Sequence, residues 1–70
     1  MAKTLVRNNI RKLRFEQDEM TQQRLAEMVG VTRQTIVAIE KEKYSPSLEA
    51  AFKIALALKK PLDEVFYYDA

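Results

Sequence analysis

The chain has 70 residues, of which 47% are hydrophobic and 31% charged, with a net charge of +2. This length allows one domain with a thin core, and the apolar content argues against a disordered chain. The sequence has no cysteine and no histidine, which excludes a disulfide framework, the usual zinc sites and any mechanism with an imidazole base. No segment resembles a membrane span or a secretory signal, so we expect a cytoplasmic protein.

Charge is distributed unevenly along the sequence. Basic residues fill the first part of the chain up to Glu16, whereas acidic residues gather near its end at Asp63, Glu64 and Asp69. The basic part suits a polyanionic partner, although an ordinary solvated helix face explains the same pattern.

The first half of the chain has helical periodicity. A helix is predicted over about 7–17, where apolar residues recur at spacings of four and three. A second is predicted over about 22–29, because Thr21 is a favourable N-cap and Gly30 stands where a helix commonly ends with positive φ.

The second half predicts three more helices and no strand. Thr32 favours the start of a helix over about 33–42, and Ser47 favours the start of another over about 48–59. Pro61 suits the first position of a short fifth helix. The side chains expected on the buried face of the fourth helix are Leu48, Ala51, Phe52, Ile54, Ala55 and Leu58.

Three residues in the segment 22–40 have steric requirements that fit together. Ala26 must be small where two helices cross, Gly30 makes the turn between them, and Ile36 fills the space between them. This pattern is typical of a helix-turn-helix, although any corner between two helices satisfies it.

The start of the helix predicted over 33–42 carries side chains that can read bases. Arg33 can donate two hydrogen bonds to guanine, and Gln34 can pair in the same way with adenine. No acidic residue precedes Glu40 in this helix, although one would favour the helix dipole at its start. An anionic partner such as phosphate explains that absence.

Short motifs at characteristic spacings extend over about residues 8–66. They are Asn9-Ile10-Arg11-Lys12-Leu13-Arg14, Thr21-Gln22, Leu25-Ala26, Val29-Gly30-Val31, Arg33-Gln34-Thr35-Ile36, Ile39-Glu40-Lys41, Lys43-Tyr44, Pro46-Ser47-Leu48, Ala51-Phe52-Lys53-Ile54-Ala55 and Asp63-Glu64-Val65-Phe66. In these motifs the chain resembles the short, stand-alone Cro/C1-type (XRE) helix-turn-helix transcriptional regulators. The resemblance implies an all-α, five-helix fold like the lambda-repressor DNA-binding domain, with the helix-turn-helix at helices 2 and 3. We expect one domain over 1–70, with a core at about 5–66 and a tail at 67–70.

The resemblance also implies roles for individual residues. Base contacts are implied for Arg33, Gln34, Val37 and Ala38. Phosphate contacts are predicted for Gln22, Thr32, Thr35, Lys43, Tyr44 and Ser45. Arg14 and Glu40 match a family pair that joins the first and third helices, and a direct phosphate contact is the alternative for Arg14.

The chain departs from the family pattern at several turns. The link at 15–20 is one residue longer than usual and lacks the common glycine. Glu42 and Lys59 replace glycines that often follow helices 3 and 4, and Pro61 replaces a frequent Ser or Thr cap. None of these positions belongs to the predicted recognition surface.

The function implied is that of a sequence-specific regulator of transcription, in the first place a repressor, that binds a palindromic operator in double-stranded DNA as a homodimer. Leu56, Tyr67 and Tyr68 are expected at the dimer interface, whereas Val65 and Phe66 are assigned to the core. An antitoxin-like or anti-repressor module that holds a partner protein is the alternative. We expect no enzyme, cofactor or metal, since no nucleophile stands beside a base.

Overall fold

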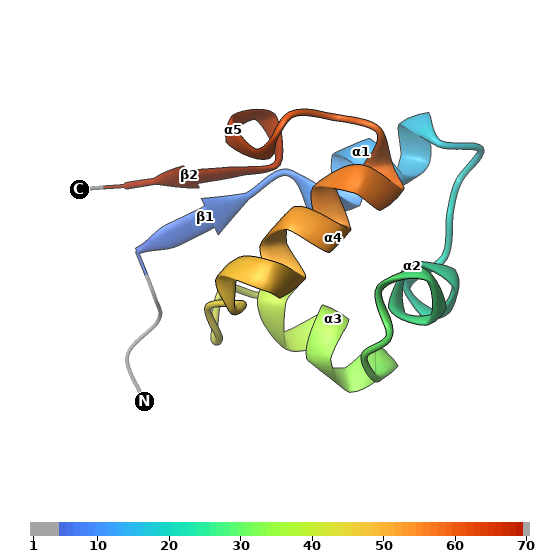
Figure 1. Ribbon diagram of the computed structural model, residues 1–70, viewed down its shortest axis with the longest axis horizontal. Coiled ribbons are helices and arrows are strands. Elements are labelled where there is room, and N and C mark those ends of the chain that lie inside the picture. The colour runs from blue at the N-terminus through green and yellow to red at the C-terminus, as the bar shows by residue number, and fades with distance from the viewer. Residues whose placement is uncertain (1–4, 70) are drawn as a thin grey trace.

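The computed structural model describes residues 5–69, which form five helices and a two-stranded antiparallel sheet (Figure 1). The elements in chain order are β1 (Val6–Asn8), α1 (Ile10–Glu16), α2 (Gln22–Val29), α3 (Arg33–Glu40), α4 (Leu48–Leu58), α5 (Leu62–Val65) and β2 (Phe66–Tyr68). The predicted five-helix fold is confirmed. Within the described range, no helix has the length and apolar content to cross a bilayer.

The strand pair corrects the expectation that the chain has no strands. β1 pairs with β2 in antiparallel register, with Val6 opposite Tyr68 and Asn8 opposite Phe66. The first helix therefore begins at Ile10 instead of about residue 7, and Tyr67 and Tyr68 belong to β2 instead of a tail. Three-residue strands are too short to show a period of two, which is why the sequence pattern missed them.

The core lies between α4 and the helices around it. Figure 1 shows α4 in the centre of the molecule, with α3 below it and α2 to its right. Each of the five helices contributes to the fully buried large side chains, which are Ile10, Leu25, Ile36, Ile39, Ile54, Leu58 and Val65. The helix-turn-helix therefore rests on α4 as a rigid support.

The buried face of α4 differs from the prediction at three residues. Leu48 is 68% exposed and Phe52 is 50% exposed, whereas Ala57 is buried. Apolar residues surround α4 on most sides, so the helical period alone could not tell which face turns inward. Leu48 and Phe52 form, with Leu56, an outward ridge with a spacing of four residues.

Three helices end in the same way, with one residue in the left-handed conformation. These residues are Gly30 with φ of 84°, Glu42 with φ of 62° and Lys59 with φ of 59°. In each case the next N–H donates to the carbonyl five residues earlier, which is the bond that closes a Schellman-type cap. The three bonds are Val31 N to Ala26 O, Lys43 N to Ala38 O and Lys60 N to Ala55 O, each 3.1 Å long.

Glu42 and Lys59 thus take the conformation that glycine usually supplies at these turns. The helices end two and one residues earlier than predicted, at Glu40 and Leu58. Pro61 was predicted as the first residue of the fifth helix, but it is the N-cap residue of α5, which begins one position later at Leu62.

Candidate nucleic-acid interface

Helices α2 and α3 form the helix-turn-helix that the sequence predicts. The hydroxyl of Thr21 accepts from the N–H of Arg24 at 3.0 Å and caps α2. The hydroxyl of Thr32 accepts from the N–H of Thr35 at 3.2 Å and caps α3. Ala26 and Ile36 are 1% and 0% exposed, as expected for the small residue and the filling residue between the crossing helices.

The first turn of α3 is open to solvent. Arg33 and Gln34 are both exposed, and no ion pair within residues 5–69 engages Arg33. Val37 and Ala38 follow on the same helix and are half-buried. The side chains predicted to read bases are therefore available to a ligand at the start of α3.

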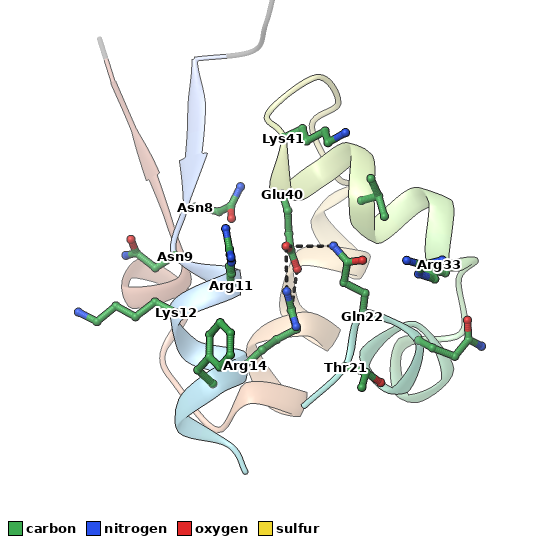
Figure 2. Close-up of a pocket in the computed structure, with 13 residues that line it drawn as sticks. Asn8, Asn9, Arg11, Lys12, Arg14, Thr21, Gln22, Arg33, Glu40 and Lys41 are labelled. Carbon is green, nitrogen blue, oxygen red and sulfur yellow. Dashed lines mark hydrogen bonds and ion pairs between the residues drawn. The ribbon is translucent and has the colours of Figure 1, made fainter. Parts of the chain in front are cut away.

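A broad groove of about 1010 Å³ lies between α1, the start of α2 and α3 (Figure 2). Its lining residues are Asn8, Asn9, Arg11, Lys12, Arg14, Phe15, Thr21, Gln22, Gln23, Arg33, Val37, Glu40 and Lys41. Arg11 and Lys12 stand on the α1 side and Arg33 and Lys41 on the α3 side. Cations on both sides of the groove suit the phosphates of a nucleic acid.

Arg11 and Lys12 are interface candidates that the residue-by-residue prediction left out. The sequence signal was their place in the basic run before Glu16. A basic run on a helix is more often a solvated surface, so only the fold shows that these two residues of α1 border the groove opposite α3.

Among the described residues that line the groove, Glu40 is the only acid, and it is paired with a basic partner. Arg14 Nε lies 2.8 Å from Glu40 Oε2, and the two side chains are only 11% and 9% exposed. Arg14 also donates through Nη1 to the carbonyl of Met20 at 2.7 Å. The structure thus contains the α1–α3 pair that the resemblance implies, and the pair neutralises Glu40 beside the cations.

Gln22 belongs to the same cluster. Its Nε2 donates to Glu40 Oε1 at 3.3 Å, as the dashed lines of Figure 2 show. Because an amide group carries two N–H donors, Gln22 has a second donor besides the one given to Glu40, and its contact with a phosphate stays a prediction. The network holds this donor in place at the first position of α2.

The other predicted phosphate contacts lie at the surface near the two ends of α3. Thr32 and Thr35 share a hydroxyl hydrogen bond of 3.0 Å at its start. Lys43, Tyr44 and Ser45 are exposed in the loop after its end. Their role in phosphate contact stays a prediction.

The residues expected at the dimer interface fall into two separate places. Tyr67 and Tyr68 are 50% and 65% exposed and line an apolar depression with Val6, Leu62 and Phe66. Leu56 is 78% exposed, but it lines a different depression with residues of α2. The fold therefore does not gather the three residues into one patch.

Comparisons with known proteins agree on the family. A family model described as helix-turn-helix matches residues 10–65. An uncharacterized HTH-type transcriptional regulator of Methanothermobacter thermautotrophicus is 47% identical over 96% of this chain and 91% of its own. The uncharacterized HTH-type transcriptional regulator YgzD of Bacillus subtilis is 42% identical over 91% of this chain and 96% of its own.

A solved structure shows the same fold. The crystal structure of a candidate DNA-binding protein from Bacteroides fragilis superposes with a TM-score of 0.77 at 27% identity, covering 89% of this chain and 98% of that one. The family consists of DNA-binding regulators and is not a class of enzymes. The chain belongs to the Cro/C1-type (XRE) helix-turn-helix family and is a transcriptional regulator with a helix-turn-helix DNA-binding domain.

Proposed function

We propose that this regulator is a repressor that binds a palindromic operator as a homodimer and reads bases through the first turn of α3. The observation that carries the proposal is the exposure of Arg33 and Gln34 beside a groove lined by cations. In a helix-turn-helix, the N-terminal residues of the second helix of the motif, here α3, enter the major groove. Arg33 then pairs with guanine, Gln34 with adenine, and the apolar Val37 and Ala38 contact thymine methyl groups.

Affinity and discrimination come from different side chains in this proposal. Arg11 and Lys12 on α1 and Lys41 just after the end of α3 border the groove and neutralise backbone phosphates, together with the donors of Gln22. The threonines at the start of α3 and the loop residues 43–45 add hydrogen bonds to the same backbone. These contacts fix the register in which Arg33 and Gln34 meet the bases.

The apolar depression at β2 and α5 is the proposed dimer surface. Tyr67 and Tyr68 expose rings there beside the half-buried Leu62 and Phe66. Aromatic and apolar side chains that cluster in a depression are typical of protein contact surfaces. We expect sedimentation at micromolar concentration to show a dimer, and a monomer both with and without DNA would contradict this surface.

Sequence-specific binding to a palindromic operator is tested by selecting bound fragments from random double-stranded DNA at two salt concentrations. We expect a palindromic site with half-sites about 34–36 Å apart, since each subunit places one α3 in a major groove. The logarithm of the affinity should fall with the logarithm of salt concentration with a slope of about −0.9 per neutralised phosphate. Recovery of fragments without a shared sequence would contradict sequence-specific binding.

A further inference from the structure

Two side chains of β1 attach that strand to the C-terminal end of the recognition helix. The Nδ2 of Asn8 donates to the carbonyl of Ile39 at 2.9 Å, near the end of α3. The Nη1 of Arg7 lies 2.6 Å from Oε1 of Glu42, just beyond that end. Arg7 also pairs with Asp69 at 3.2 Å, after β2. One arginine therefore joins the strand pair to the turn after α3.

The turn held by Arg7 has a conformation that its residue disfavours. Glu42 has φ of 62°, in the left-handed region that residues with a Cβ avoid. The next N–H, that of Lys43, donates to Ala38 O at 3.1 Å and sets the direction in which the chain leaves α3. This bond closes the turn from within, and the Glu42 side chain, only 20% exposed, adds a contact with Arg7 from outside the turn.

The turn leads directly into the loop predicted to contact the DNA backbone. Lys43, Tyr44 and Ser45 follow Glu42 and are exposed. We infer that Arg7 is a positioning residue for DNA binding, which fixes the Glu42 turn and so presents residues 43–45 to a phosphate. This inference rests on the proposed function, because it assigns those three residues to the DNA backbone.

Arg7 itself is a poor candidate for a phosphate contact, because two carboxylates already compensate its charge. The hydrogen bond that Arg7 donates to Glu42, followed by the negative charge of Glu42, raises the pKa of Arg7 above its ordinary value. The guanidinium of Arg7 therefore stays ionised at neutral pH. Its effect on DNA binding must pass through Glu42.

The variant Glu42→Gln distinguishes this positioning role from a purely electrostatic effect, because the two predict opposite changes in the affinity for DNA. Removing an anion next to bound DNA should tighten binding if only charge matters. If Glu42 is the point at which Arg7 holds the turn, binding to the selected operator should weaken by roughly three- to tenfold. The salt slope should then become shallower by about 0.9 for the phosphate contact that is lost.

Two matched variants control for charge. Glu49→Gln removes the negative charge of a side chain that is 82% exposed at the start of α4, and we expect equal or slightly tighter binding. Asp69→Asn removes the more exposed partner of Arg7, 60% exposed, and leaves the Glu42 contact in place. This variant should keep the affinity and the salt slope of the wild type. Thermal unfolding of each variant checks that the protein is folded at the temperature of the binding measurement.

Arg7→Met and the double variant complete the test. Arg7→Met alone should weaken binding as much as Glu42→Gln, and the double variant should be no weaker than either single one. Tighter binding by Glu42→Gln, or effects that multiply in the double variant, would overturn the positioning role. A wild-type protein that selects no operator would contradict the proposed function instead.

Discussion

Arg14→Ala is expected to lower the free energy of unfolding by about 3–5 kcal/mol, because it leaves a nearly buried carboxylate without its cation. Glu40 is 9% exposed and would keep only the weaker contact from Gln22 at 3.3 Å. The carbonyl of Met20 would also lose its donor. A chain of this size has a total stability of roughly 4–10 kcal/mol, so the change removes a large part of it. Thermal or urea unfolding measures the effect.

Arg24→Ala is the matched control for Arg14→Ala. Arg24 also faces a carboxylate, that of Glu27, but at 4.0 Å and with both side chains more than half exposed. Solvent screens such a pair, and we expect a change within about 0.5 kcal/mol. Equal stability of the two variants would show that burial does not strengthen the Arg14 pair. The double variant Arg14→Met with Glu40→Met should recover stability relative to Arg14→Ala, because no unpaired charge is left.

Arg33→Ala is expected to weaken binding to the selected operator by about 1–3 kcal/mol, roughly five- to 150-fold, through loss of a bidentate base contact. The preference for one base pair in each half-site should relax, while binding to unrelated DNA changes much less. Stability should change little, because Arg33 is exposed and has no ionic partner among the described residues. Titration of operator variants at one salt concentration measures both effects.

Lys53→Ala controls for the loss of one positive charge. Lys53 is 50% exposed on α4 and does not line the groove. It should reduce affinity for operator and unrelated DNA to a similar, small extent. If Arg33→Ala behaves like Lys53→Ala and keeps the same base preference, Arg33 does not read a base.

The sequence predicted those elements whose boundaries depend on residues next to them in the sequence. Thr21 and Gly30 set the ends of α2, and Thr32 sets the start of α3, each through a local cap. The spacing of Ala26, Gly30 and Ile36 then predicted how the two helices cross. These local rules are the reason that the helix-turn-helix was found with correct boundaries, apart from the last turn of α3.

The parts that the sequence missed depend on residues far apart in the chain. β1 forms because Val6–Asn8 lies beside β2, and nothing within either segment indicates a strand. The exposed side of α4 depends on which neighbours cover it. The role of Glu42 at the turn after α3 required knowing that Arg7 stands beside it, 35 residues away in sequence.

The strand pair has a consequence for the order in which the molecule assembles as it folds. Pairing Val6 with Tyr68 closes a chain segment of about 60 residues, and such distant contacts form slowly compared with neighbouring helices. We expect the α2–α3 corner to form early and the tyrosine-bearing strand to dock late, which stopped-flow tyrosine fluorescence can follow. An incompletely folded chain would then lack the proposed dimer surface at β2 and α5. Only fully folded chains would therefore pair with a second copy.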